Sequence, residues 1–331
     1  MAMQRNITIP VVALVAFVVF TGGFFIGRHS ITALPVQQTL QKLEVSENST
    51  SYKFINPLLF CQDQNLDNQN LDAMQSSIET YVAQEKQNGD LIDAAFYFKD
   101  LNGGPWSLIN PAFRTFPASL LKVPLAISIY KHAEANPGFL DTKVIFSGGP
   151  NTDQSEHFQA PQQIQANTTY QVKNLLDYML ADSDNSAMYL LGSMISPQEL
   201  ADSYTRLSIE PPTSAGYTVG VKTYSSFFTI LFSGTYLSAN DSESLLSILS
   251  KSTFTQGIVA GVPGGTMVAH KFGEADTADG TMWLTDCGIV YKPNQPYLIC
   301  VMTHGSSPAT LANVISTISG TVYAALQSKA N

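Results

Sequence analysis

The sequence predicts a mixed α/β fold: an antiparallel sheet is flanked by N-terminal and C-terminal helices, and an all-helical lobe is inserted in the middle of the chain. Strand-like runs rich in aromatic and β-branched residues occur near both ends of the region from residue 61 to residue 331, whereas the stretch between them has helical periodicity. Because strands from both ends of the chain have to share one sheet, we expect the helical stretch beside that sheet, with a cleft between the two.

Residues 1–29 predict a transmembrane signal anchor. The run from Ile7 to Gly27 holds no charged residue, and basic residues flank it. About 20 apolar residues in a helix cross the roughly 30 Å hydrocarbon core of a bilayer. A cleaved signal peptide is the alternative, but its apolar core is usually about 7 to 15 residues long, and no convincing small-x-small cleavage site is present here. Residues 30–60, rich in Gln, Ser, Thr and Asn, are expected to form a linker.

A single domain is then expected over residues 61–331, and it opens with a helix and a hairpin. Apolar residues recur at helical spacing from Leu71 to Val82, and Asn88-Gly89 ends this helix. Two strand-like runs, at 91–98 and 106–109, flank a Gly-rich turn. This pattern indicates a β-hairpin.

The middle of the chain predicts a series of helices separated by stretches that contain Pro or Gly. They are expected at residues 119–135, 170–180, 183–194, 197–207, 221–237 and 242–251. Three strand-like runs follow, at 266–272, 281–291 and 297–303. The chain closes with a helix that has one continuous apolar face between Leu311 and Leu326.

Composition and cysteine usage limit the partners that the chain can have. The formal net charge of −9 argues against binding to nucleic acid, whose phosphates would be repelled. Three cysteines allow at most one intramolecular disulfide. Cys287 and Cys300 fall in successive strands that a hairpin could bring opposite each other, and Cys61 could equally be a partner. No spacing of cysteines and histidines predicts a metal site.

Ser119 and Lys122 form a Ser-x-x-Lys pattern at the start of a predicted helix. Residues at i and i+3 lie on one helix face, about 5 to 6 Å apart at Cβ, so the hydroxyl and the amine can meet. A lysine can take the proton of a serine if burial or a neighbouring cation lowers the pKa of the lysine. A chain of this length carries roughly one such pattern by chance, so the pattern needs further motifs to support it.

Two further motifs follow along the chain. One is Ser183-Asp184-Asn185, and the other is His270-Lys271-Phe272-Gly273 on a predicted strand. In the order Ser-x-x-Lys, Ser-Asp-Asn and Lys-x-Gly, the three motifs resemble those of the penicillin-recognising serine enzymes, and most closely those of the class A β-lactamase type. The resemblance covers roughly Leu71 to Leu326.

The resemblance implies a serine hydrolase whose domain faces the cell wall. Its substrate would be a β-lactam or a D-Ala-D-Ala stem peptide of peptidoglycan. Together with the predicted anchor, the resemblance predicts a single-pass protein of the cell membrane with an extracytoplasmic catalytic domain. We expect a monomer that needs no cofactor.

The resemblance also assigns a role to each motif residue. Ser119 would attack a carbonyl and become acylated, and Lys122 would help to take its proton. Ser183 would pass a proton to the departing nitrogen, while Asn185 would hold the amide side chain of the substrate and orient Lys122. Lys271 would supply positive charge near Ser183 and near the carboxylate of the substrate, and this cation would help to keep Lys122 neutral.

The same resemblance places the oxyanion of the reaction between two backbone N–H groups. One belongs to Ser119, and the other belongs to Glu274, the residue after Gly273. Such donors typically lower the barrier by about 3 to 4 kcal/mol.

Two departures from the family pattern bear on substrate and turnover. Phe272 stands where the family has Thr or Ser, and a phenyl ring cannot donate a hydrogen bond to a substrate carboxylate. We expect that the carboxylate is held differently, or that the substrate or activity is altered. The family loop Glu-x-x-Leu-Asn, whose glutamate activates the water for deacylation, has no counterpart in the short segment 206–213. Glu210 in this segment is either a remnant of that base or a solvated loop residue.

Three functions therefore stay open from the sequence. The first is a serine hydrolase that is acylated on Ser119 and hydrolyses β-lactams. The second is a penicillin-binding D,D-peptidase that β-lactams only acylate, which the missing loop glutamate favours. The third is a non-catalytic wall-binding protein on the same scaffold. Phe272 supports this third function, whereas the five intact polar residues of the motifs argue against it.

Overall fold

A computed structural model of the chain describes residues 52–56, 68–149, 156–213 and 216–327. The predicted signal anchor, most of the predicted linker and Cys61 lie outside the described residues.

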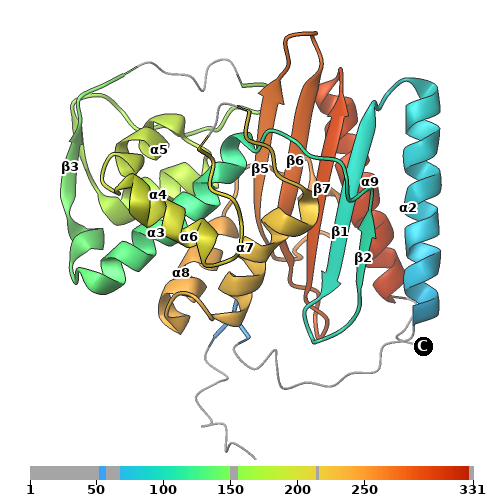
Figure 1. Cartoon of the computed structure of the whole chain (residues 1–331), viewed down its shortest axis with the longest axis horizontal. Helices are drawn as coiled ribbons and strands as arrows, with labels where there is room; N and C mark the ends of the chain where they lie inside the picture. Colours follow the sequence, from blue (N-terminus) through green and yellow to red (C-terminus); the bar gives the residue numbers. More distant parts are fainter. Residues whose placement is uncertain (1–51, 57–67, 150–155, 214–215, 328–331) are drawn as a thin grey trace, which may run out of the picture. The chain divides into compact units, whose positions relative to one another are not determined.

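Five strands form one antiparallel sheet in the order β2-β1-β7-β6-β5 (Figure 1). Their bounds are Asp93–Asp100 for β1, Trp106–Ile109 for β2, Val268–Asp276 for β5, Met282–Val290 for β6 and Tyr297–Gly305 for β7. The sheet thus combines strands from both ends of the chain, as the sequence predicts. β5 lies at one edge, and this edge strand carries the Lys-x-Gly motif.

The register of β6 and β7 places Cys287 directly opposite Cys300, and a disulfide joins them. Of the pairings that the sequence leaves open, this is the one formed. The bond lies in the buried centre of the sheet, where both residues are 0% exposed.

Two helices cover one face of the sheet, α2 (Asn68–Asn88) and α9 (Pro308–Gln327). α9 buries the apolar face that the sequence predicts, because Leu311, Val314 and Ile318 pack into one core cluster with strand residues such as Phe96. In the described part of the chain, α9 alone is long and apolar enough to cross a membrane. Its apolar side chains are instead packed against the sheet.

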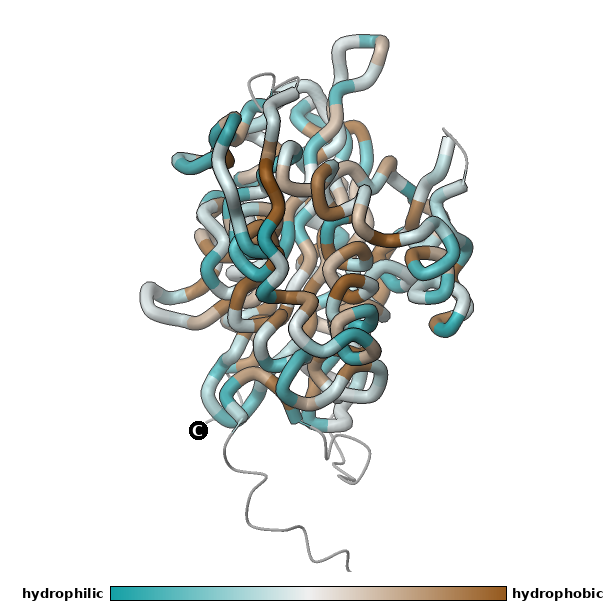
Figure 2. The backbone as a smooth tube through the Cα atoms, turned by 90° about the vertical axis from the view of Figure 1, so that its left-hand side faces the viewer, coloured by the Kyte–Doolittle hydropathy of each residue, from teal (hydrophilic) through white to brown (hydrophobic). Residues whose placement is uncertain are grey.

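The middle of the chain forms the helical lobe, which lies beside β5 in Figure 1. Its helices are α3 (Lys122–Ala135), α4 (Val172–Ala181), α5 (Asn185–Gly192), α6 (Pro197–Thr205), α7 (Val221–Ser233) and α8 (Ala239–Leu249). A small antiparallel pair, β3 (Lys143–Phe146) and β4 (Thr168–Gln171), was not predicted. Figure 2 shows that hydrophobic stretches run through the inside of the fold while hydrophilic residues gather in the outer turns.

Candidate active site

Ser119 lies on a short 3-10 helix, η3 (Ala118–Leu121), and α3 begins immediately afterwards. The sequence predicts one helix from residue 119, and the structure differs because the first turn is tighter. Ala118 has a positive φ of 48°, a conformation that L residues seldom adopt, so the chain turns sharply just before the serine. The buried Tyr224 hydroxyl, from α7, donates a hydrogen bond of 2.9 Å to the Leu120 carbonyl and holds this turn in place.

Lys122 is fully buried, and its amine binds the oxygen atoms of all three neighbouring motif residues. Lys122 Nζ lies 2.7 Å from Ser119 Oγ, 3.0 Å from Ser183 Oγ and 2.7 Å from Asn185 Oδ1. It also donates a hydrogen bond to the backbone carbonyl of Ser183. The structure therefore brings together the Ser-x-x-Lys and Ser-Asp-Asn motifs, which are about 60 residues apart in the chain, around one amine.

Lys271 reaches the same cluster from β5. Its amine lies 2.9 Å from Ser183 Oγ and 3.0 Å from the Phe272 carbonyl oxygen, and its side chain is 0% exposed. Burial, followed by the nearby charge of Lys122, lowers the pKa of Lys271 well below its usual value. Two lysine amines that share the Ser183 hydroxyl repel each other when both are charged, which favours the loss of one proton from the pair.

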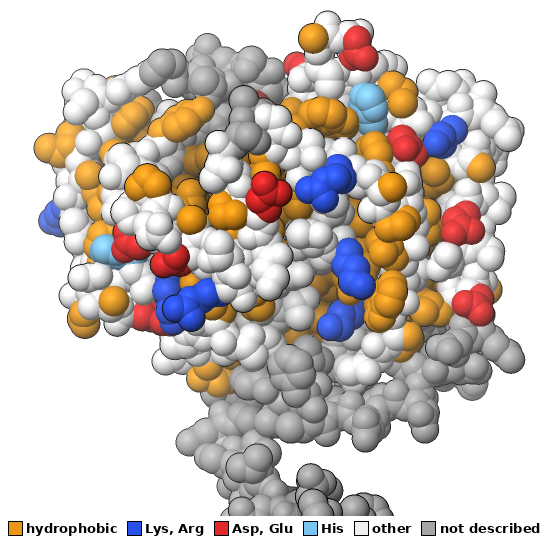
Figure 3. Space-filling view, in the orientation of Figure 1, with side chains coloured by type: hydrophobic (Ala, Val, Ile, Leu, Met, Phe, Trp, Pro, Cys, Tyr) orange, Lys and Arg blue, Asp and Glu red, His pale blue; other side chains and the backbone are white. Residues whose placement is uncertain are grey.

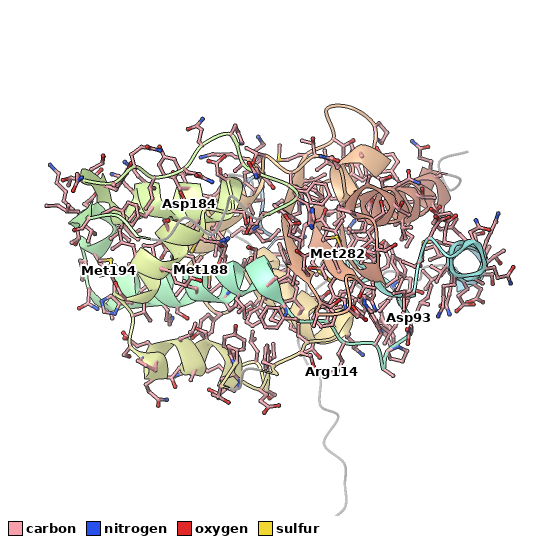
Figure 4. The ribbon with its side chains drawn as sticks, turned by 90° about the horizontal axis from the view of Figure 1, so that it is seen from above. Asp93, Arg114, Asp184, Met188, Met194 and Met282 are labelled. Atoms are coloured by element: carbon pink, nitrogen blue, oxygen red, sulfur yellow. A yellow bond between two sulfur atoms is a disulfide. The ribbon has the colours of Figure 1, made fainter. Side chains whose placement is uncertain are left out.

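Asp184 explains why Ser183 and Asn185 face the cluster. Its buried carboxylate caps α5 by accepting a hydrogen bond of 2.8 Å from the Ala187 N–H. The other carboxylate oxygen accepts from the Ile164 N–H at 2.7 Å, which fixes the preceding loop. Figure 4 shows Asp184 in the helical lobe, on the same side as Met188 of α5. By fixing the backbone at the start of α5, Asp184 keeps the side chains of Ser183 and Asn185 directed at Lys122.

The cleft in front of Ser119 has a volume of about 380 Å³. Besides Ser119, its polar lining comes from Glu156, Asn185, Glu274 and other side chains at the rim. Lys122, Ser183 and Lys271 form the buried layer behind it. Among the described residues that line this cleft there is no lysine or arginine.

Gly273 allows β5 to approach η3 closely. A Cβ at this position would lie 2.9 Å from the Pro117 carbonyl oxygen, 3.1 Å from the Leu120 nitrogen and 3.2 Å from the Ser119 nitrogen. These are backbone atoms, which cannot rotate away as the end of a side chain can. Glu274, the next residue, lines the same cleft as Ser119, so the predicted oxyanion donors belong to two segments that are in direct contact.

Replacing Gly273 by alanine is therefore expected to lower the rate constant of acylation on the order of 10²-fold, because the added methyl group forces the two predicted oxyanion donors apart. Stopped-flow labelling with a fluorescent penicillin measures this rate. Gly264→Ala is the matched control, because a Cβ at Gly264 meets nothing within 4 Å. A Gly273→Ala rate within about threefold of wild type would contradict the close-approach argument.

Phe272 does not line the cleft, and its ring packs in an apolar cluster instead. The ring stacks on Phe254 with centroids 4.2 Å apart and meets the edge of Phe158 at 6.3 Å. The Lys271 amine lies 4.3 Å from the centre of the Phe272 ring, within the range of a cation–π contact. Phe272 thus links the buried lysine to the loop that contains Phe158.

Glu156 is a residue of the cleft that the sequence analysis does not identify. Its Oε1 accepts a hydrogen bond of 2.9 Å from Asn185 Nδ2, so Asn185 joins Glu156 on one side to Lys122 on the other. Burial raises the pKa of the Glu156 carboxyl, while the charge of Lys122 and the hydrogen bond from Asn185 oppose that rise. No local pattern in a Gln-rich loop indicates such a residue, because only the fold brings it to the Ser-Asp-Asn motif.

The carboxylate of Glu274 ties this loop to β5. It accepts hydrogen bonds from the backbone N–H groups of His157, at 3.1 Å, and Phe158, at 3.0 Å. With the ring of Phe158 packed on Phe254 and Phe272, these two bonds position Glu156 at the cleft.

Glu210 lies in the loop after α6, where its side chain is exposed to solvent. It is not among the described residues that line the cleft. A catalytic role for Glu210 stays a prediction.

A serine hydrolase that works through an acyl-enzyme needs a serine hydroxyl next to a proton acceptor in a cleft. Ser119 and Lys122 meet this requirement, so the fold and the site indicate a serine hydrolase. Comparison with family models gives the same answer. Residues 73–326 match the model described as the Beta-lactamase enzyme family, so the chain belongs to that family. The predicted family and fold class are confirmed.

Solved structures with the same fold include both β-lactamases and a protein named PBP-A. TLA-1 extended-spectrum β-lactamase is 19% identical with a TM-score of 0.65, and the match covers 77% of this chain and 98% of that one. A class A β-lactamase from Bacteroides cellulosilyticus DSM 14838 is also 19% identical, with a TM-score of 0.65 and coverage of 77% and 99%. PBP-A is 20% identical, with a TM-score of 0.63 and coverage of 77% and 96%. A comparison with curated proteins finds no match.

Proposed function

We propose that this protein is a membrane-anchored serine hydrolase that is acylated on Ser119 by β-lactams and hydrolyses the resulting ester. The observation that supports this proposal best is the 2.7 Å contact between Ser119 Oγ and the fully buried amine of Lys122. A lysine in this position can accept the hydroxyl proton, provided that its amine is neutral.

Acylation then follows from the arrangement of the cluster. Lys122 Nζ takes the proton of Ser119 as Oγ bonds to the lactam carbonyl carbon, and the N–H groups of Ser119 and Glu274 bind the oxyanion. When the C–N bond breaks, the departing nitrogen takes the proton of the Ser183 hydroxyl. Ser183 Oγ lies within 3.0 Å of Lys122 Nζ and 2.9 Å of Lys271 Nζ, so either amine can return a proton to it.

Deacylation needs a base for the attacking water. Of the three carboxylates among the described residues that line the cleft, Glu156, Glu274 and Asp276, we assign this step to Glu156, because it is hydrogen-bonded to Asn185 of the Ser-Asp-Asn motif. It lines the same cleft as Ser119, and it contacts Asn185, which in turn contacts Lys122. Water would bond to the ester carbonyl carbon while its proton passes to Glu156, and the ester C–O bond would break with a proton returning to Ser119 Oγ. Glu210, exposed and outside the cleft lining, is the less suitable candidate.

An extracytoplasmic domain on a membrane anchor fits two features of the chain. The run from Ile7 to Gly27 has the length and composition of a membrane span. The disulfide between Cys287 and Cys300 is a bond that persists in oxidising compartments and is rare in the cytosol.

A second candidate is a D,D-peptidase that β-lactams trap. The missing counterpart of the family's loop glutamate favours this alternative, because an acyl-enzyme that has no base for the attacking water persists. A mutant of PBP-A, which shares the fold, has a solved structure as an acyl-enzyme complex with penicillin-G.

A time course with a fluorescent penicillin on the full-length protein distinguishes the two candidates. Loss of the drug with only transient labelling is expected for the proposed hydrolase. Persistent labelling without drug loss would favour the trapped peptidase. The absence of both labelling and drug loss would contradict acylation by β-lactams altogether.

A further inference from the structure

A second cavity, of about 330 Å³, lies in the helical lobe next to the cleft of Ser119. The two share Leu121, Met188 and Tyr189 in their linings, so the cavity and the cleft adjoin at these three side chains. The remainder of the second lining is mainly apolar. It comes from α3, α5 and α6 and from the segments that follow α5 and α6, and it includes Leu125, Gly192, Ile195, Leu200 and Pro212.

The course of the chain explains why this space is open. α5 ends at Gly192 and α6 begins at Pro197, so only a short connection crosses the region. Gly192 has no side chain to fill the gap, and of the described residues in the segment between α6 and α7, only Pro212 lines the cavity. Hydrophobic side chains reach the surface over the helical lobe on the face shown in Figure 3.

We infer that this cavity is a subsite for an apolar side chain carried by the acyl group that Ser119 receives. The inference rests on the proposed function and deepens it by naming the class of acyl donor. The shared lining argues for this occupant, because Leu121 lies two residues after the nucleophile and Met188 and Tyr189 follow Asn185 in α5. An apolar cavity of about 150 Å³ holds a benzene molecule, so this one has room for a longer alkyl chain or for roughly two rings.

Penicillins that share one nucleus and differ only in an n-alkanoyl side chain test the subsite. The second-order rate constant of acylation of the full-length protein is measured with acetyl, butanoyl, hexanoyl and octanoyl compounds. Each buried methylene contributes up to about a fourfold change, so we expect the rate constant to rise at least about tenfold from acetyl to octanoyl. A series that stays flat or falls with chain length overturns the subsite.

Two substitutions of Gly192 fill the cavity to different extents. A Cβ at Gly192 would lie 3.9 Å from Leu125 Cδ2, an ordinary contact, so alanine fits without displacing a neighbour. We expect Gly192→Phe to fill the space and to reduce the octanoyl-to-acetyl ratio of rate constants to within about twofold of one. Gly192→Ala removes space for about one methylene, so we expect it to lower this ratio by no more than roughly fourfold. Thermal melting identifies a variant that fails to fold, and Gly192→Leu then takes the place of Gly192→Phe.

The outcomes separate this inference from the function on which it rests. Labelling of Ser119 with no dependence on chain length refutes the subsite and leaves acylation intact. If the rate constant of acylation still rises with chain length in Gly192→Phe, the apolar contact lies elsewhere, and the subsite is also refuted. No labelling by any compound refutes the proposed function, and the subsite with it.

Discussion

Replacing Lys122 by methionine is expected to lower the rate constant for acylation of Ser119 by on the order of 10³-fold or more. Methionine keeps much of the length of the buried side chain but removes the amine that lies 2.7 Å from the Ser119 hydroxyl. A positioned general base typically contributes about 10² to 10⁴ in rate, and the loss also deprives Asn185 and Ser183 of a shared partner. Stopped-flow labelling with a fluorescent penicillin measures the rate.

Lys131→Met is the matched control for this experiment. Lys131 lies on the same helix, α3, but its side chain is 45% exposed and pairs with Glu134 at the surface. We expect the control to acylate as wild type does. A rate for Lys122→Met within about tenfold of wild type would show that another group takes the serine proton.

Replacing Glu156 by glutamine is expected to slow deacylation by about 10² to 10⁴-fold while the label still attaches to Ser119. Glutamine has the same shape and can still accept the hydrogen bond from Asn185 Nδ2 through its amide oxygen, but it cannot take a proton from water. The decay of the labelled enzyme after removal of free penicillin measures the step.

Glu210→Gln is the comparison for this second variant. Glu210 is an exposed carboxylate outside the cleft lining, so we expect its replacement to leave deacylation unchanged. Slow decay in Glu210→Gln together with normal decay in Glu156→Gln would reverse the assignment of the base.

The pH dependence of deacylation gives an independent test of Glu156. A general base acts in its ionised form, so the rate falls as the pH drops through the pKa of its carboxyl. Burial raises the pKa of Glu156 above its ordinary value of 4.5, so the midpoint of this acid limb should lie above pH 4.5. The limb should disappear in Glu156→Gln, and its persistence there would assign the limb to another group.

The sequence predicts those parts of the site that are encoded locally. Ser119 and Lys122 are one helical turn apart in the sequence. Asp is a preferred N-cap residue, and Asp184, between Ser183 and Asn185, caps α5. The register of β6 and β7 places Cys287 opposite Cys300, which is one of the pairings that the sequence leaves open. For these features, spacing along the chain determines proximity in space.

The parts that the sequence does not predict depend on contacts between distant segments. Glu156 reaches Asn185 because Glu274 of β5 binds the backbone of the intervening loop, and neither residue carries a local signal of that contact. The 3-10 turn at Ala118 follows from the close approach of Gly273 and the hydrogen bond from Tyr224. The packing of Phe272 on Phe254 is likewise set by tertiary structure.

The mass and position of the adduct that penicillin G leaves on the full-length protein test most directly whether Ser119 is the nucleophile. After brief incubation and acid quenching, mass spectrometry of the intact protein and of its proteolytic peptides should find one adduct with the mass of the whole drug. The adduct should map to the peptide that contains Ser119, and Ser119→Ala should carry none. An adduct on another residue, or one that persists in Ser119→Ala, would contradict the assignment of Ser119 as the nucleophile.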